Sequence, residues 1–265
     1  MENDARTDGR PGRAFSAPPG GVGTAVGARP RTAVPMRRRR TDRPAAGRAV
    51  TILADHLALP GTLTVPPDAL GVVAFAHGSG SSRLSPRNVQ VARGLNEARL
   101  GTLLFDLLTP GEAADRRTVF DVPLLGDRLT TAVEWLRWQP EARHVPLGLF
   151  GASTGAAAAL WTAAELGAAI GAVVSRGGRP DLAGARLGEV LAPTLLVVGG
   201  RDDVVLGLNR RALRELRCAA ALEVVEGATH LFEEPGALEQ VAALASGWFR
   251  DHLGRGGAAT EERTR

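Results

Sequence analysis

The stretch Val145-Pro146-Leu147-Gly148-Leu149-Phe150-Gly151-Ala152-Ser153-Thr154-Gly155 decides how the rest of the chain is interpreted. Its first half is apolar and predicts a strand. Its second half is Gly-x-Ser-x-Gly and is followed by alanines at 156–159, which favour a helix. Strand, sharp turn and helix form the context in which a serine is raised above a sheet as a nucleophile. Ser153 is therefore the first candidate catalytic residue.

The two glycines of this motif have a steric explanation. The residues two before and two after a serine on such a turn press against neighbouring backbone, so both must lack a side chain. Gly151 and Gly155 meet that requirement. A helix beginning at about Thr154 would direct free backbone N–H groups toward Ser153, and the N–H of Thr154 is one expected donor to an oxyanion.

Outside this stretch, short apolar runs alternate with helical patterns. We expect eight strands, at Ala49–Ala54, Leu57–Val65, Val72–His77, Gly101–Asp106, Val145–Phe150, Ile170–Ser175, Pro193–Gly199 and Ala221–Glu226. Helices are expected over Pro86–Arg99, 123–138, the segment after Ser153, Leu206–Leu216 and Leu238–Phe249. An antiparallel pair followed by this alternation predicts an α/β fold, with a mostly parallel sheet, helices on both faces and functional loops at the carboxyl ends of the strands. Residues 107–122 suffice for a short cap, so no large lid domain is expected.

Charge is unevenly distributed along the 265 residues. The formal net charge is +4 and the pI is about 10.8, but residues 1–48 hold eleven arginines against four acidic residues, which leaves −3 for the rest. We expect 1–47 to be a disordered tail, 48–253 one domain and 254–265 a disordered end. The domain is not expected to bind nucleic acid, and the arginine run at 37–40 is interpreted as solvated.

Targeting signals and disulfides are not apparent in the sequence. No apolar segment follows the arginines as a secretory signal requires, and no stretch is long enough to cross a bilayer. The one cysteine, Cys218, excludes an intrachain disulfide and fits a reducing compartment. We therefore expect a cytoplasmic protein that does not associate with membranes.

A candidate carboxylate follows the seventh predicted strand, in Gly199-Gly200-Arg201-Asp202-Asp203. A carboxylate in a glycine-rich loop after an apolar strand suits the residue that orients a catalytic histidine. Asp202 is preferred because it comes first after the glycine turn. Asp203 is the alternative, and it is equally well interpreted as the cap of a helix starting near Val205.

A candidate histidine follows the last predicted strand, in Gly227-Ala228-Thr229-His230. A histidine on a loop there can reach both a serine and a carboxylate, and its near-neutral pKa lets it accept and return a proton. By itself a loop histidine is ordinarily a surface residue. The order Ser153, Asp202, His230 changes that interpretation, because it is the order of a serine nucleophile, an acid and a base on this type of fold.

The loop after the third predicted strand, His77-Gly78-Ser79-Gly80-Ser81-Ser82, is the candidate for the second oxyanion donor. Its glycines allow backbone to approach a substrate, and the N–H of Gly78 or Ser79 is the expected donor. His77 is interpreted as a loop anchor rather than a base. The loop lacks the Gly-Lys-Ser/Thr ending of a phosphate-binding loop, and the chain contains no lysine.

From about 48 to 253 the sequence resembles the α/β-hydrolase superfamily and, within it, the dienelactone hydrolase-like proteins. The resemblance rests on Phe75–Asn88, Phe150–Ala159, Ser175–Leu182, Gly199–Val205 and Gly227–Pro235, and it extends to a bacterial branch sometimes fused to a phosphoribosyltransferase domain. It implies triad roles for Ser153, Asp202 and His230, no cofactor, and association with a phosphoribosyltransferase. Typical dienelactone hydrolases carry cysteine at the elbow, so the serine here favours an esterase or lactonase acting on a small molecule.

Four arginines follow strands on the expected active-site side, namely Arg83, Arg87, Arg176 and Arg179. A guanidinium there could bind a carboxylate or phosphate of the substrate with two hydrogen bonds, and Arg176, Arg83 and Arg179 are the candidates. The alternative is that these arginines pair with Asp106, Asp115 or Asp181. Neither a metal nor an organic cofactor is expected, since no ligand cluster has suitable spacing.

Three functions remain open at this point. The leading one is a serine hydrolase that cleaves a small ester or lactone through an acyl-enzyme. An acyltransferase would use the same residues with an alcohol or amine as acceptor, and a binding protein on a hydrolase scaffold would use none of them catalytically.

Overall fold

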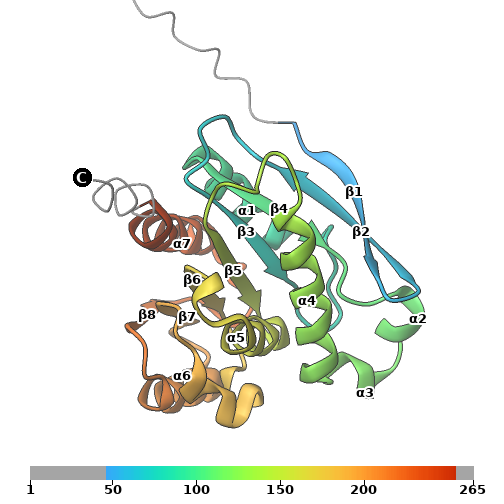
Figure 1. The fold of residues 1–265 in the computed structure, drawn as a ribbon. Coiled ribbons are helices and arrows are strands. Elements are labelled where there is room, and N and C mark those ends of the chain that lie inside the picture. The colour runs from blue at the N-terminus through green and yellow to red at the C-terminus, as the bar shows by residue number, and fades with distance from the viewer. Residues whose placement is uncertain (1–45, 255–265) are drawn as a thin grey trace, which may run out of the picture. The chain divides into compact units, whose positions relative to one another are not determined.

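The structure is a computed structural model that describes residues 46–254 (Figure 1). The disorder expected for the two ends falls almost entirely outside the described residues. The strands are β1 (Arg48–Ala54), β2 (Leu57–Thr64), β3 (Gly71–Ala76), β4 (Leu100–Phe105), β5 (Leu147–Ala152), β6 (Ala172–Arg176), β7 (Thr194–Gly199) and β8 (Ala220–Val225). The helices are α1 (Pro86–Glu97), α2 (Pro110–Ala113), α3 (Arg116–Val119), α4 (Val122–Arg137), α5 (Thr154–Leu166), α6 (Asp203–Glu215) and α7 (Ala237–Leu253), with 3₁₀ segments η1 (Gly167–Ala169) and η2 (Pro180–Glu189).

The eight strands form one sheet in the order β1-β2-β4-β3-β5-β6-β7-β8. β1 and β2 are an antiparallel hairpin, β2 is antiparallel to β4, and the six strands from β4 to β8 run parallel. The predicted α/β fold with a mostly parallel eight-stranded sheet is thereby confirmed. The carboxyl ends of β3, β5, β6 and β7 are neighbours, so the loops that follow these strands meet at one edge.

Helices cover both faces of the sheet (Figure 1). On one face α1 and α7 pack together over a core that includes Phe75 and Phe150, whose rings stack at 4.6 Å. On the other face α4, α5 and α6 contribute to a core that includes Leu149 and Leu160. Within residues 46–254 no helix is long and apolar enough to cross a membrane.

Several element boundaries differ from the sequence-based expectation, for local reasons. β5 begins at Leu147 rather than Val145, because Pro146 has no N–H for the ladder and instead accepts from Val72 N–H through its carbonyl. The helix expected from Leu206 begins at Asp203, because Asp202 is its N-cap. The short cap expected over 107–122 contains α2 and α3, and the described residues include no larger insertion.

Candidate active site

Ser153 lies on a sharp turn between β5 and α5. Its backbone has φ 53° and ψ −122°, in the left-handed range that costs a non-glycine residue free energy. A Cβ at Gly151 would overlap the backbone of Ala156 and the Gly155 carbonyl, and a Cβ at Gly155 would overlap the carbonyls of Ala76 and His77. The packing around the turn therefore requires glycine at both positions, as the motif predicts.

The loop after β6 fixes the main chain of Ser153. Its N–H donates to the carbonyl of Arg176 (3.2 Å), and its carbonyl accepts from the N–H groups of Ala156 (3.1 Å) and Arg179 (3.0 Å). Ser153 Oγ makes no hydrogen bond to any residue of 46–254. The turn is thus held by backbone contacts that leave the hydroxyl free to move.

Asp202 follows β7 and uses its two carboxylate oxygens for different partners. Oδ1 accepts from the N–H of Val205 at 3.3 Å, which makes Asp202 the N-cap of α6. Oδ2 lies 2.7 Å from Nδ1 of His230. The capping role considered for Asp203 is wrong, because Asp203 is the first helical residue and its side chain is exposed.

The loop that carries His230 sits tightly against the end of β7. Gly199 permits the approach, because a Cβ there would come within 2.5 Å of the carbonyls of Ala228 and Thr229. Glu234 Oε1 accepts from the N–H of Thr229 at 3.0 Å, and Phe232 anchors the loop with a buried ring and a left-handed φ of 55°. Sequence reasoning missed Glu234, whose pKa is lowered by the hydrogen bonds from its own N–H and from Thr229.

The His230 loop also touches the loop that holds Ser153. Gly177 has φ 50°, and a Cβ at this position would come within 3.2 Å of the His230 carbonyl and 3.6 Å of its Nδ1. Because the preceding residue, Arg176, binds the N–H of Ser153, one short loop contacts both the serine and the histidine. The side chain of His230 is 39% exposed, against 14% for Asp202, so the imidazole lies at the mouth of the site.

His77 anchors the loop after β3. Its Nε2 accepts from the N–H of Leu107 at 3.0 Å, and its Nδ1 donates to the carbonyl of Gly78 at 3.1 Å, which defines the neutral tautomer. Burial lowers the pKa of His77, which opposes protonation. The ring therefore ties the β3 loop to the β4 loop, and neither nitrogen has a free role.

The two expected oxyanion donors of this loop, the N–H groups of Gly78 and Ser79, differ in whether they already have a hydrogen-bond partner. The N–H of Ser79 donates to Oγ1 of Thr154 at 2.9 Å, a contact that sequence reasoning missed because it joins residues 75 apart. Gly78 packs directly on the elbow, where a Cβ would come within 2.9 Å of Ser153 Cβ. The amides of Gly78 and Thr154 bond to no residue of 46–254, so these two are the available donors.

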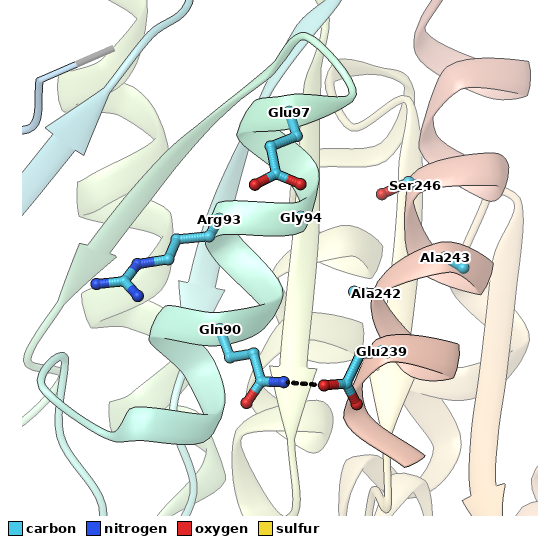
Figure 2. A pocket seen from close by; sticks show the side chains of 8 residues that line it. All are labelled: Gln90, Arg93, Gly94, Glu97, Glu239, Ala242, Ala243 and Ser246. Atoms are coloured by element: carbon cyan, nitrogen blue, oxygen red, sulfur yellow. Dashed lines mark hydrogen bonds between the residues drawn. The ribbon is translucent and has the colours of Figure 1, made fainter. Parts of the chain in front are cut away.

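A small cavity of about 20 Å³ lies beside these amides, under the cap. Its walls are the β3 loop and apolar side chains of the cap and α4: His77, Gly78, Ser79, Gly80, Ser81, Leu108, Ala113, Val119, Leu125 and Thr154. That volume holds about one water molecule. A larger groove of about 430 Å³ lies between α1 and α7, where Gln90 bonds to Glu239, and contains none of the candidate site residues (Figure 2).

The cap over this cavity is tied to α4 by a carboxylate. Glu112 in α2 accepts from Arg128 at 3.1 Å and forms a reciprocal capping box with Thr109. Burial raises the pKa of Glu112, but the hydrogen bonds from Thr109 and the charge of Arg128 outweigh it, so the pKa is lowered. Glu112 thus links the cap to α4 through one ion pair.

The candidate substrate arginines fall into two groups. Arg83 binds Asp106 through its main-chain N–H and its guanidinium, both at 2.6 Å, and Arg179 binds Asp181 at 2.9 and 2.7 Å. The hydrogen bond with Asp181 raises the pKa of Arg179. The alternative interpretation, pairing with nearby aspartates, therefore describes these two. Arg176 is different, because it is only 8% exposed and pairs with no carboxylate of 46–254.

Comparison with known proteins identifies the family. No family model matches the chain. A dienelactone hydrolase structure from Anabaena variabilis is 50% identical, covers 80% of this chain and 100% of its own, and superimposes with a TM-score of 0.77. The chain therefore belongs to the dienelactone hydrolase-like α/β-hydrolases, as predicted.

Structures of lower sequence identity and relatives with longer chains were also found. Est1E from Butyrivibrio proteoclasticus (16% identical, TM-score 0.67, covering 78% of this chain and 99% of its own) and a dienelactone hydrolase-like phosphotriesterase from metagenomic libraries (20% identical, TM-score 0.65, 80% and 100%) share the fold. A putative phosphoribosyl transferase of Mycobacterium tuberculosis is 57% identical over 212 residues, 80% of this chain. The chain spans about half the length of these curated relatives, at 48%.

Proposed function

We propose that the protein is a serine hydrolase that cleaves a small-molecule ester or lactone through Ser153, His230 and Asp202. The observation that carries the proposal is the 2.7 Å contact between Asp202 Oδ2 and His230 Nδ1. It lies beside the strained turn of Ser153, on loops that contact one another. The family membership supports hydrolysis in general, and the serine at the elbow supports an ester or lactone as substrate.

Asp202 would set the tautomer of His230. A carboxylate opposite Nδ1 favours the form with its proton on Nδ1, which leaves Nε2 as the base. Nε2 takes the proton of Ser153 as Oγ attacks the carbonyl carbon, and Asp202 stabilises the imidazolium that results. The histidine then returns this proton to the leaving alkoxide, which departs as an alcohol or, in a lactone, stays on the acyl chain.

The amides of Thr154 and Gly78 would hold the oxyanion of the tetrahedral intermediate. Both amides adjoin Ser153 and donate to no residue of 46–254, and the Thr154 amide lies at the positive end of α5. Water activated by His230 then cleaves the acyl-enzyme. Every proton in this cycle is carried by this chain's own residues or by water.

Covalent labelling with a fluorophosphonate probe tests the nucleophile. We expect labelling of the native protein at Ser153 and none in Ser153→Ala, whereas the control Ser246→Ala, on α7, should label fully. A screen of short esters and lactones follows. Equal labelling of Ser153→Ala, or no labelling together with no cleavage of short esters, would contradict the proposal and favour a binding protein.

Product analysis distinguishes hydrolysis from acyl transfer. If an added alcohol or amine captures the acyl group in preference to water, the protein is an acyltransferase using the same residues.

We further infer that the activity named for the mycobacterial relatives lies in the part of their chains not matched here. The match to the dienelactone hydrolase of Anabaena variabilis, which covers 100% of that hydrolase, supports this inference. An assay for phosphoribosyl transfer tests it, and we expect this chain to show none.

A further inference from the structure

Arg176 is an unusual residue in this fold because its charge is buried without a counter-charge among the described residues. It ends β6, exposes 8% of its surface, and its Nη1 has no hydrogen-bond partner among residues 46–254. Two other candidate arginines at this end of the sheet, Arg83 and Arg179, each bind an aspartate. Burying a charge without a partner costs several kcal/mol in general, and a buried charged group with a shifted pKa is a candidate for a binding role.

The neighbours of Arg176 add positive charge. Burial lowers the pKa of Arg176 to about 10, and the positive charge of Arg87, in the first turn of α1, contributes to the same shift. Arg87 donates through Nη1 to Glu233 at 3.1 Å, while its buried Nε has no partner in the described chain. Among the described residues, the exposed carboxylate of Glu233 therefore pairs with Arg87 alone, and none pairs with Arg176.

The start of α1 has unused polar groups as well. Asn88 is 1% exposed, and its Oδ1 has no partner among the described residues. A half-turn of the Asn88 amide exchanges its oxygen and its N–H₂ group, so Asn88 can donate to a ligand at this position. The N-cap residue, Ser85, makes no side-chain cap bond, and the first turn contains no acidic residue, so the positive end of the helix is not compensated.

This cluster adjoins the proposed catalytic residues. Arg176 is paired in register with Ala152, the residue before Ser153, and Glu233 follows His230 by three positions. Side chains alternate along a strand, so Arg176 points to the same face as Val174, the face covered by α1 and α7. The cluster thus lies between the start of α1 and the His230 loop.

We propose that Arg176, Arg87 and Asn88 bind an oxyanion group of the substrate, a carboxylate or phosphate, and so select small esters that carry a negative charge. This inference rests on the proposed hydrolase activity. An oxyanion offers several acceptors to Arg176 Nη1 and Arg87 Nε, two buried donors that have no partner among residues 46–254. Glu233, with 62% of its side chain exposed, can release Arg87 to admit the anion.

Thermal unfolding tests the site without relying on catalysis. Tm is measured at constant ionic strength in chloride, and then with added inorganic phosphate or acetate in separate arms. We expect a saturable rise for the native protein with at least one anion, and the larger rise identifies the preferred group. The control Arg93→Gln, an exposed arginine on the same helix, should respond as the native protein does.

Arg176→Met gives the sharpest prediction, because it replaces an uncompensated charge by an apolar side chain of similar length. We expect its Tm in chloride to be higher than the native value by roughly 2–4 °C, and its response to the anion to be lost. A native protein that responds to neither anion, or an equal response in native and Arg176→Met protein, overturns the proposal. If Arg176→Met does not fold, Arg87→Gln, at the exposed side of the cluster, provides the same comparison.

A matched substrate pair links the site to turnover. The pair is 4-nitrophenyl succinate, which carries a free carboxylate, and its neutral methyl ester. We expect the ratio of kcat/KM for the acidic over the neutral ester to fall about tenfold or more in Arg87→Gln and to be unchanged in Arg93→Gln. An unchanged ratio in Arg87→Gln overturns the proposal.

The two proposals fail in different ways. If the anion raises Tm through Arg176 but Ser153 is not labelled by a fluorophosphonate, the anion site stands and the hydrolase proposal fails. If Ser153 is labelled but no anion raises Tm, the hydrolase proposal stands and the anion site fails.

Discussion

Asp202 and His230 are joined through only one of the two carboxylate oxygens, because the other oxygen of Asp202 caps α6 at Val205. The residue proposed to orient the base is therefore itself held in place by the helix that it starts. A change at Asp202 consequently affects both catalysis and stability, and different substitutions separate these effects.

Asp202→Asn should keep the cap and lose the carboxylate opposite His230. We expect kcat for a cleavable ester to fall about 10³–10⁴-fold, because an amide N–H₂ facing Nδ1 favours the wrong tautomer, while the free energy of unfolding changes little. Asp202→Ala should show the same loss of kcat and, in addition, lower the free energy of unfolding by about 1 kcal/mol. Steady-state kinetics and urea unfolding measure the two quantities, and an Asp202→Ala protein as stable as Asp202→Asn would show that the cap is unimportant.

His77 should make stability depend on pH near neutrality. Burial lowers its pKa in the folded protein below the ordinary value of 6.5, so between the folded and unfolded pKa values the unfolded chain binds more protons. The contribution is fully present above about pH 6.5 and is lost as the pH falls below it. We expect the free energy of unfolding to decrease from pH 7.5 to 5.5, and less steeply in His77→Gln. Equal slopes in the two proteins contradict the assignment.

The glycines of the elbow should tolerate no added methyl group. Gly155→Ala places a Cβ against the carbonyls of Ala76 and His77, which are backbone atoms that cannot move aside. We expect the free energy of unfolding to fall by about 1–3 kcal/mol, with a decrease in Tm of several degrees. Gly111→Ala is the matched control, since a Cβ there meets no atom within 4 Å and the backbone is not left-handed. Calorimetry of the two variants decides the point.

Glu112 should control whether the cap stays closed. Glu112→Ala removes the partner of Arg128, whose side chain is only 8% exposed, and it also removes half of the capping box with Thr109. Allowing for the partial exposure of Glu112, we expect a loss of about 1–2 kcal/mol in the free energy of unfolding, together with faster proteolysis between residues 109 and 121. Glu97→Ala, an exposed carboxylate without an ion pair in 46–254, should change neither. Unchanged proteolysis in Glu112→Ala would mean that other contacts hold the cap.

Sequence predicted the features that depend on short-range patterns. The alternation of apolar runs and helical periodicity was enough for the sheet and its layers, and the Gly-x-Ser-x-Gly spacing was enough for the turn at Ser153. Because parallel strands end at one edge, the order of strands also brought Asp202 and His230 to the same place.

Contacts between distant side chains were not predictable in this way. Nothing in the sequence indicates that Thr154 Oγ1 takes the N–H of Ser79, or that Glu234 holds Thr229. The four arginines near the site look alike in sequence, yet Arg83 and Arg179 bind aspartates while Arg176 is buried and pairs with no carboxylate of 46–254. Which carboxylate each arginine meets depends on strand register and side-chain direction, and the pattern of residue types encodes neither.

Arg176 has two roles, since its carbonyl accepts from the N–H of Ser153 and its guanidinium belongs to the cluster proposed to bind the substrate anion. Because the backbone of Arg176 contacts the backbone of Ser153, a shift of the loop that reshaped the charged cluster would also move the proposed nucleophile. An engineer seeking a different substrate charge should replace side chains at 87, 88 and 176 and leave the loop's length and path untouched. Grafting the β6 loop from a relative would instead change selectivity and reactivity together.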